Sequence, residues 1–279
     1  MTSSQRRRRR SHSGSKLKYW LLAIFIGAII VGLCYDRCQS PRLQASTADA
    51  AGLTATVIPA DIDSEIVEYP GFTVSFNKST HIPNYVAWQL TREHTDGPIS
   101  RKGFDFAEDP AVPGSATPAD YRRSGYDRGH MAPAGDMKWS ADAMRACFYM
   151  TNMCPQDDAL NRGSWATVES NCRNWAVRDS LLVIVCGPVL TDRLTRTIGQ
   201  SGVVVPQRFF KVVLAPYANP PRAIGFVMNN GVVEGGAQRS ATTVDEVERI
   251  TGYDFFSALP DEIENQVEQQ CNYPQWQRL

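Results

Sequence analysis

The stretch YDRGHMAPA at residues 126–134 opens the most informative part of this chain. It is followed by TN at 151–152, PQ at 155–156, NRGSW at 161–165 and a glutamate at 169. The only histidine of this region is His130, while the chain's other three, His12, His81 and His94, have no comparable neighbours. A histidine, an arginine, carboxamides and a carboxylate can together activate water, bind an anion and hold a hard cation. The region therefore predicts a catalytic site.

Hydrolysis of a phosphodiester bond is the chemistry that this set fits best. It needs a nucleophilic water, stabilised charge on a five-coordinate phosphorus and help for the departing sugar oxygen. Because an ordinary histidine pKa near 6.5 leaves a neutral fraction at neutral pH, we predict His130 to be the general base. Arg128 is expected to bind a phosphate oxygen in bidentate fashion. A salt bridge to Asp127 or another acid is the alternative for Arg128.

These motifs resemble, in order and spacing, the DNA/RNA non-specific endonuclease family, in particular its mitochondrial endonuclease G branch and bacterial relatives. The family signature is D-R-G-H, then T/S-N-x-x-P-Q, then N-x-G-x-W at a helix start with a later glutamate. The likeness runs from about 69 to about 256, and its specific centre is 126–173. The resemblance implies cleavage of both DNA and RNA to 5′-phosphate and 3′-hydroxyl ends. Contacts to phosphates rather than base edges further imply weak sequence preference.

The resemblance also implies a metal site. Asn161 matches the family's direct metal ligand, and Mg²⁺, which keeps much of its water, can be held by one such neutral oxygen. Mn²⁺ is the expected substitute, and no small-molecule cofactor is expected. Glu169 is expected to act catalytically through a metal-bound water. Zinc is not expected, because no Cys/His cluster with ligand spacing is present.

Further residues are assigned more loosely. Asn152 is taken as catalytic and Gln156 as substrate-binding, since both match family positions that organise the pocket through the substrate or the loop of the base. Arg101 aligns with an upstream arginine of the secreted bacterial nucleases, and Arg173 is added as a second substrate-binding candidate. A surface ion pair between Glu169 and Arg173 is the alternative for these two. Asp127 and Gly129 are expected to be architectural, the glycine by allowing an unusual backbone angle.

The hydrophobic pattern predicts an α+β domain with a mainly antiparallel sheet and flanking helices over 69–279. Strands are expected at 72–76, 84–90, 180–186, 203–214 and 224–228, and helices at 140–147, 164–178 and 243–251. Within the helix from 164, spacings of four would place Asn161, Trp165, Glu169 and Arg173 on one face. The family arrangement implied by the resemblance is two short strands and a helix around the metal, a ββα site of the His-Asn type.

Charge divides the chain sharply. Residues 1–38 hold eight basic residues and one acid, which leaves 21 basic and 28 acidic residues in 39–279. The net negative charge of residues 39–279 argues against a broad basic surface that binds nucleic acid, so phosphate binding is expected to be local.

The N-terminal segments are expected to form a basic head (1–18), a transmembrane anchor (19–35) and a linker (36–68). The 17 uncharged residues 19–35 span about 26 Å as a helix, the short end of what a bilayer requires. The positive flank predicts a cytoplasmic N-terminus and an extracytoplasmic body, at a bacterial periplasmic or outer face. A cleaved signal peptide remains an alternative, as does a mitochondrial presequence with the body facing the intermembrane space. Small residues in the anchor allow a homodimer.

Seven cysteines are present. A disulfide from Cys271 to Cys172 or Cys154 is plausible in an oxidising compartment, whereas Cys147 and Cys186 are expected to be buried thiols. Cys34 and Cys38 lie at the anchor.

Two rival functions stay open beside a membrane-tethered nuclease that acts on DNA and RNA. One is a surface protein that captures nucleic acid for uptake with little or no catalysis, and the other is a phosphodiesterase for smaller substrates. Affinity that depends strongly on salt and survives chelation would favour capture.

Overall fold

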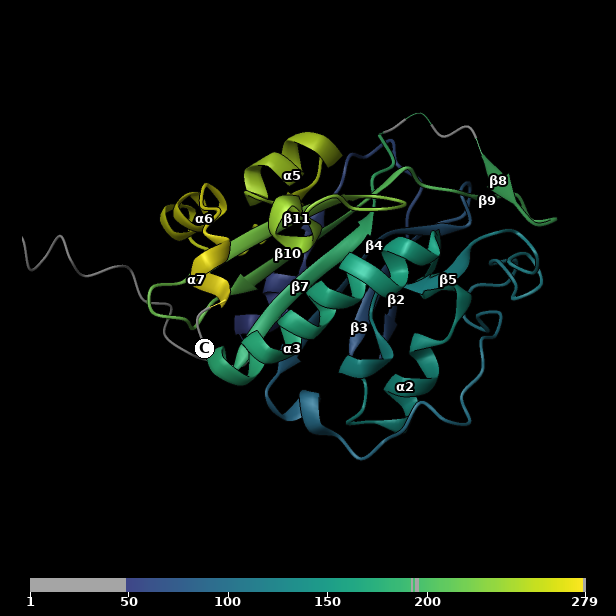
Figure 1. The fold of residues 1–279 in the computed structure, drawn as a ribbon, viewed down its shortest axis with the longest axis horizontal. Coiled ribbons are helices and arrows are strands. Elements are labelled where there is room, and N and C mark those ends of the chain that lie inside the picture. The colour runs from purple at the N-terminus through teal and green to yellow at the C-terminus, as the bar shows by residue number, and fades with distance from the viewer. Residues whose placement is uncertain (1–48, 192, 194–195, 278–279) are drawn as a thin grey trace, which may run out of the picture. The chain divides into compact units, whose positions relative to one another are not determined.

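The computed structural model describes residues 49–191, 193 and 196–277, and a seven-stranded antiparallel sheet lies at its centre. The strand order is β12-β11-β10-β7-β4-β3-β2 (Figure 1). The strands are β2 (Glu65–Tyr69), β3 (Phe72–Asn77), β4 (Ile82–Thr91), β7 (Leu181–Pro188), β10 (Arg208–Ala215), β11 (Arg222–Asn229) and β12 (Ala241–Thr242). The predicted α+β class with a mainly antiparallel sheet is confirmed.

The predicted strand at 203–214 is in fact two strands. β9 (Val203–Val204) pairs with β8 (Thr197–Ile198) in a separate ribbon, and β10 begins at Arg208. Pro206 lies between them, and proline lacks the N–H that a continuous ladder requires. Sequence analysis also missed the edge strand β2, which alternates between half-buried and exposed residues.

Alternate residues of the central strands enter two different cores. Along β7, Leu182, Ile184 and Cys186 belong to one core, and Leu181, Val183 and Val185 belong to the other. Side chains of a strand alternate between its faces, so a strand covered on both faces is apolar throughout. This explains the continuous apolar run that marked β7 in the sequence.

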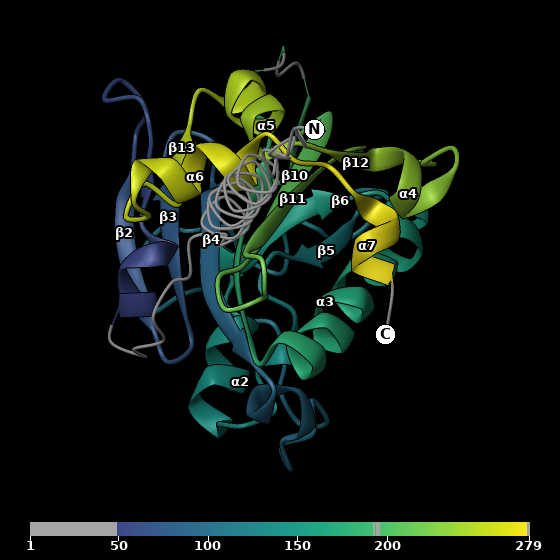
Figure 2. The ribbon, with the colours of Figure 1, turned by 90° about the vertical axis from the view of Figure 1, so that its left-hand side faces the viewer.

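Helices cover each face of the sheet (Figures 1 and 2). The first core is shared by α2 (Ala141–Cys147), α3 (Ala166–Asp179), α4 (Gly236–Ser240) and α7 (Tyr273–Gln277). The second is shared by α5 (Val244–Thr251) and α6 (Asp261–Glu268). Ser140 caps α2 by accepting from the Ala143 N–H, and Thr243 caps α5 by accepting from the Glu246 N–H. These caps fix the two helix starts that the sequence predicted.

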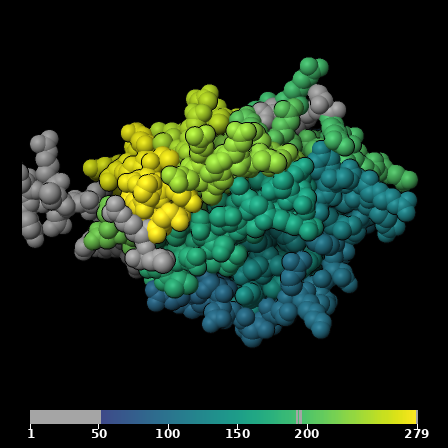
Figure 3. All heavy atoms as spheres, in the orientation of Figure 1, coloured from purple at the N-terminus to yellow at the C-terminus, as the bar shows by residue number. Residues whose placement is uncertain are grey.

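The C-terminal helix α7 lies against α3, as Figure 3 shows where the yellow end of the chain meets its teal middle. The rings of Trp175 and Trp276 are 4.7 Å apart, and Arg178 Nη1 donates to the Trp276 carbonyl at 2.9 Å. Packing against α7 thus holds the far end of the helix that carries several of the candidate site residues.

Folded structure begins earlier than the predicted boundary at residue 69. The helical turn η1 (Asp49–Thr54) buries Leu53 in the second core, and β1 (Thr56–Val57) pairs with β13 (Asp254–Phe255). The segment 49–68 is therefore not an open linker. Within the described residues, no helix combines the length and apolar character needed to cross a bilayer. The predicted head (1–18) and anchor (19–35) lie outside the described residues.

The five cysteines of the described residues are free thiols. Cys154 and Cys172 are buried in the first core, whereas Cys271 is exposed, so the suggested disulfide from Cys271 is wrong. Cys147 and Cys186 are buried thiols, as predicted. Cys34 and Cys38 lie outside the described residues.

Candidate active site

Two short strands and a helix meet on the first-core side of the sheet. β5 (Asp127–His130) pairs antiparallel with β6 (Met153–Gln156), and the chain then turns through η5 (Leu160–Trp165) into α3. The helical turn η5 is broken at Gly163, whose φ of −99° and ψ of −110° are not helical. The kink separates Asn161 from the helix that carries Glu169. This is the arrangement of strands and helix that the resemblance implied.

A cleft of about 1010 Å³ opens over these elements. Its charged and titratable lining residues are Arg101, Asp127, Arg128, His130, Lys138, Arg162, Glu169 and Arg173. Asn161 also lines the cleft. Five of these side chains are basic and two are carboxylates, so the cleft is locally cationic although the body is acidic. Lys138 and Arg162 were not predicted as site residues; the fold brings Lys138 to this wall, whereas Arg162 follows Asn161 within the NRGSW motif.

His130 ends β5 in a largely apolar setting. Its ring lies 5.4 Å from the Phe106 ring and 5.1 Å from the Phe148 ring, and its carbonyl accepts from Trp165 Nε1 at 3.2 Å. The His130 Nε2 atom is buried and has no hydrogen-bond partner within the described residues. Burial, followed by the charge of Arg101, lowers the pKa of His130 to about 3. The imidazole is therefore neutral near pH 7 and can accept a proton.

The amide nitrogen of Asn161 is held by a hydrogen bond, and within the described residues its amide oxygen is not. Its Nδ2 donates to Asp127 Oδ2 at 2.9 Å, and a carboxylate can only accept, so this contact fixes the amide orientation. Arg162 Nε lies 3.4 Å from the same oxygen and 2.6 Å from Asp158 Oδ1. Asp127 thus ties β5 to η5, in agreement with its expected architectural role. The Asn161 Oδ1 is left as the amide atom free to bind another group.

Glu169 lies on α3 beside a buried cation that sequence analysis missed. Burial raises the pKa of Glu169 to about 7, while the charge of Lys211 opposes that rise. Lys211 on β10 is only 1% exposed, and its Nζ lies 4.3 Å from the Trp165 ring and 5.2 Å from the Trp88 ring. A single charge within the apolar run FFKVVL was the available signal. A lysine there must face a buried partner or a cavity.

Arg173 pairs with Asp136 rather than with Glu169. Arg173 Nη1 lies 3.0 Å from Asp136 Oδ1, and Asp136 Oδ2 also accepts from Trp88 Nε1 at 3.1 Å. The side chain of Asp136 is 1% exposed, so this is not the weak surface pair considered from the sequence. Arg173 is anchored at one nitrogen while it lines the cleft.

Arg128 makes no ion pair within the described part of the chain, which removes the salt-bridge alternative. Its Nη2 donates to the Pro118 carbonyl at 2.8 Å, and its guanidinium lies 5.1 Å from the Phe106 ring and 6.0 Å from the Tyr121 ring. The Arg128 Nε is buried without a hydrogen-bond partner. Arg101 is exposed and lies 5.5 Å from the Phe148 ring. Both guanidiniums retain donors for an anion in the cleft.

Asn152 does not line the cleft, and of its two expected roles, contact with the substrate or with the loop of the base, its hydrogen bonds fit the second. It is fully buried; its Oδ1 accepts from the Ala132 N–H, and its Nδ2 donates to the Ala132 and Cys147 carbonyls, all at 2.9 Å. Its amide instead holds the loop that follows His130.

Gln156 and Gly129 also differ from expectation. Gln156 is fully buried on β6 and outside the cleft lining, and its side chain packs against Gly129 beside His130, so it is placed to support the strand of the base rather than to face the cleft. Gly129 is not among the residues with positive φ. A Cβ at Gly129 would lie 2.1 Å from Gln156 Oε1, so glycine is required by this close approach and not by an unusual backbone angle.

A model of the DNA/RNA non-specific endonuclease family matches residues 49–262. This chain belongs to the DNA/RNA non-specific endonuclease family. The family match begins at residue 49, where the described structure also begins. The resemblance stated from the motifs is thereby confirmed.

Similar members of the family include mitochondrial nucleases. "Nuclease EXOG, mitochondrial" of mouse is 34% identical over 70% of this chain, and "Nuclease 1, mitochondrial" of Schizosaccharomyces pombe is 34% identical over 73%. The alignments cover 58% and 69% of those proteins, so the chain spans little more than half of the mouse relative. The solved structure of EndoG in complex with EndoGI matches with a TM-score of 0.69 and 26% identity. That match covers 78% of this chain and 96% of the EndoG chain.

Proposed function

We propose that this chain is a metal-dependent endonuclease that hydrolyses DNA and RNA phosphodiesters, leaving 5′-phosphate and 3′-hydroxyl ends. One observation carries the proposal: a neutral imidazole and an amide with a free oxygen line one cationic cleft. Family membership supports the same reaction class.

His130 is the proposed general base. Its neutral form accepts a proton from the attacking water, and the flanking phenyl rings keep competing water away from the ring. A pKa of about 3 makes a weak base, but a bound phosphate places negative charge beside Arg101 and favours the protonated imidazole. The pKa of His130 therefore rises when substrate binds, which brings it closer to the working pH.

The residues fit a divalent metal at Asn161. The donor set is one neutral oxygen with a carboxylate nearby, which is what Mg²⁺ accepts while it keeps most of its water, and Mn²⁺ takes similar ligands. Asn161 Oδ1 would hold the ion directly and Glu169 would hold it through water. When bound, the ion supplies charge stabilisation at the phosphate and at the leaving oxygen. Asp127 keeps the Asn161 oxygen available by holding the amide nitrogen.

Arg128 and Arg101 are the proposed phosphate-binding residues, and Arg173 is a weaker candidate because Asp136 already engages it. The buried and unpartnered Nε of Arg128 gains a partner when a phosphate oxygen approaches. Such contacts recognise the backbone, so weak sequence preference and action on both DNA and RNA are expected.

The first experiment compares cleavage of plasmid DNA and of RNA by the full-length chain, purified in mild detergent, with Mg²⁺ and with EDTA. The variants His130→Ala and Asn161→Ala are run beside it. Cleavage of both polymers only with metal, and its loss in both variants, is the expected result. Mononucleotide esters serve as the small-substrate comparison, and preferential cleavage of these would instead indicate a phosphodiesterase.

Binding without cleavage is the outcome that would overturn the proposal. A folded chain that retains DNA affinity in EDTA, with strong salt dependence and no cutting, would favour nucleic-acid capture. If His130→Ala cleaved at the wild-type rate, His130 would not be the general base, but the rest of the proposal would stand.

We further propose that residues 19–35 tether the nuclease to a membrane. The support is the uncharged 17-residue segment with its basic flank. Several relatives are named as mitochondrial, which favours an inner membrane with the body facing the intermembrane space over a bacterial surface. Alkaline carbonate extraction and protease protection of the chain in mitochondria test both points. Release of the chain into the carbonate supernatant would exclude the membrane tether. A homodimer through residues 19–35 remains a prediction, which crosslinking can test.

A further inference from the structure

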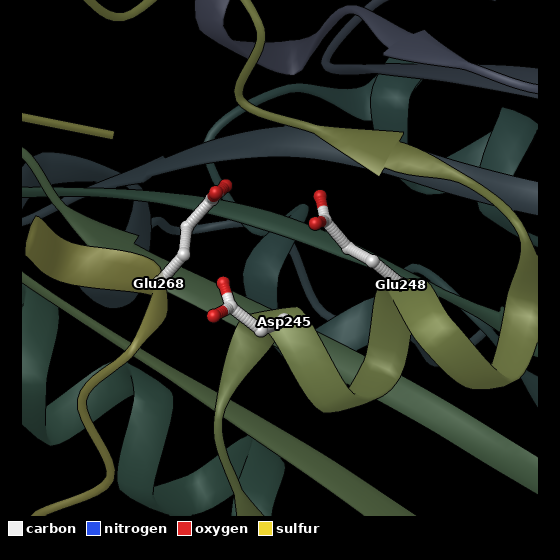
Figure 4. A group of neighbouring side chains, drawn as sticks. All are labelled: Asp245, Glu248 and Glu268. Atoms are coloured by element: carbon white, nitrogen blue, oxygen red, sulfur yellow. The ribbon is translucent and has the colours of Figure 1, made fainter. Parts of the chain in front are cut away.

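Three carboxylates from two helices converge on the second-core side of the sheet (Figure 4). Asp245 lies in the first turn of α5, Glu248 lies one turn later, and Glu268 is the last residue of α6. One oxygen of each lies within 4.8 Å of one oxygen of each other. In Figure 4 the three side chains point into the space between α5 and α6.

Glu268 is the least favourably placed of the three. The residue is only 6% exposed, and its Oε1 is buried without any hydrogen-bond partner in the described part of the chain. It also lies at the C-terminal end of α6, where the negative end of the helix dipole repels a carboxylate. A buried carboxylate normally has a cation or several donors beside it.

No such cation is supplied by the described residues. Asp245, Glu248 and Glu268 form no ion pair there, and Arg249 on the same helix is engaged by Glu246 at 2.6 Å. Glu248 Oε1 accepts one backbone N–H, from Phe255 at 2.8 Å. Asp254 and Glu264 add further negative charge nearby. Burial, and then these neighbouring carboxylates, raise the pKa of Glu268 to about 9, and burial raises that of Glu248 to about 7.

We infer that Asp245, Glu248 and Glu268 bind a calcium ion that joins α5 to α6, on the face of the sheet opposite the catalytic cleft. The arrangement of the ligands favours Ca²⁺ over Mg²⁺, because Mg²⁺ demands a near-ideal octahedron and keeps several waters, whereas Ca²⁺ takes carboxylate oxygens in flexible geometry. Three carboxylates on two separate helices, one of them exposed, form an adaptable oxygen site of the kind that Ca²⁺ accepts.

The ion would stabilise the fold without a part in the chemistry. The site is built on helices that pack in the second core, while the cleft belongs to the first core. Ca²⁺ binding only to the folded state raises the unfolding temperature as its concentration exceeds the dissociation constant. A three-carboxylate site that is partly exposed is expected to have a dissociation constant of about 10⁻⁴–10⁻³ M.

The test measures Ca²⁺ binding and thermal unfolding of the full-length chain and of two variants. Glu268→Gln keeps the shape of the buried side chain and removes its charge. Glu262→Gln makes the same change at an exposed residue of the same helix and serves as the matched control. All three proteins are stripped with EDTA and titrated with CaCl₂ or MgCl₂ by calorimetry, and the unfolding temperature is recorded at each end point. Nuclease activity is assayed in parallel in MgCl₂.

The inference predicts that CaCl₂ raises the unfolding temperature of the wild type and of Glu262→Gln, and more than MgCl₂ does. Glu268→Gln should lose one bound Ca²⁺ and the thermal shift, while it keeps full cleavage. Both variants keep the proposed catalytic metal site, so Ca²⁺ bound there contributes equally to the stoichiometry and thermal shift of each. The difference between Glu268→Gln and Glu262→Gln therefore reports only on the second site. Equal Ca²⁺ stoichiometry and equal thermal shifts in these two variants would overturn the inference, as would a wild type without any Ca²⁺-induced shift. In that case protonation of Glu268, and not a bound ion, reduces the repulsion among the three carboxylates.

Discussion

Two groups of buried carboxylates lie on opposite faces of the sheet and have opposite surroundings. On the cleft face, Asp136 pairs with Arg173, and the charge of Lys211 opposes the rise in the pKa of Glu169. On the other face, the charged groups that most affect the pKa of Glu268 are carboxylates. Burial alone would raise every one of these pKa values. The charge of Lys211 opposes the rise at Glu169, whose pKa is about 7, whereas neighbouring carboxylates add to the rise at Glu268, whose pKa is about 9.

The comparison teaches that burial of an acid has two different consequences in one domain. Beside a fixed cation, a carboxylate at the edge of a cleft can be ionised near neutral pH and remain available for catalysis. Without a cation, a buried carboxylate such as Glu268 takes up a proton or recruits an ion from solution. The following variants separate these two cases.

His130→Ala is expected to have the largest effect, since it removes the proposed base of the cleft face. Cleavage of plasmid DNA should fall by about 10²–10⁴-fold while the fold and DNA affinity are kept. His94→Ala is the control, because His94 stacks on Trp139 at 4.6 Å outside the cleft lining. A comparable loss in both variants would show that the effect is not specific to the cleft.

Lys211→Met directly tests the buried cation. Methionine keeps much of the side-chain shape, but the change leaves Glu169 and Asp136 with less compensating charge, so unfolding free energy should drop by about 3–5 kcal/mol. Urea denaturation measures this drop. Lys78→Met is the control, since its pair with Glu65 is exposed and should contribute little to stability. Addition of Glu169→Gln to Lys211→Met should restore part of the loss, and failure to do so would mean that the two charges are not coupled.

Asp127→Asn is expected to have an intermediate effect confined to the metal requirement. It weakens the acceptor that orients Asn161, so the Mg²⁺ concentration for half-maximal cleavage should rise by about 10–100-fold. Asp158→Asn is the matched control, because Asp158 pairs with Arg162 and not with Asn161. If both variants needed the same extra Mg²⁺, loss of the Arg162 contact would explain the result.

Glu268→Gln in EDTA should leave cleavage unchanged after Mg²⁺ is restored and should alter only how stability depends on pH. The folded pKa of Glu268, about 9, lies above its ordinary value of 4.5, so ionisation disfavours the folded state. Stability of the wild type should therefore fall as pH rises from about 4.5 to about 9. The variant should show a shallower fall than Glu262→Gln in urea titrations across this range. Identical slopes would mean that Glu268 ionises without penalty.

Much of the fold could be predicted because its signals are local. Ser140 and Thr243 each precede an apolar-periodic run, and both cap helices at the predicted positions. β3, β4, β7 and β11 were recognised by apolar and β-branched runs. The edge strand β2 was missed because its five residues include two glutamates and none of them is fully buried, and β1 was missed because its partner β13 is distant in sequence.

The fold brings several residues chosen for their chemistry to one cleft, and their catalytic roles stay predictions. His130, Asn161 and Glu169 do line one cleft. Asn152 and Gln156 match the same motifs but point into the interior, and no local pattern distinguishes an inward from an outward side chain on so short a strand. Lys211 is distant in sequence from every motif and reaches the site only because the fold brings β10 to the Trp165 ring of η5.

Residue types and their order limit the chemistry that is possible here to that of a histidine, an amide oxygen and arginines in a family-specific order, on an α+β pattern of strands and capped helices. Which of these groups meet depends on the fold, since burial, pKa and hydrogen-bond partners arise from residues far apart in the chain. Asp127 and Asn161 meet across β5 and η5, and Glu248 meets Glu268 across α5 and α6. Such contacts depend on how the elements pack, and packing geometry cannot be read from residue identity alone.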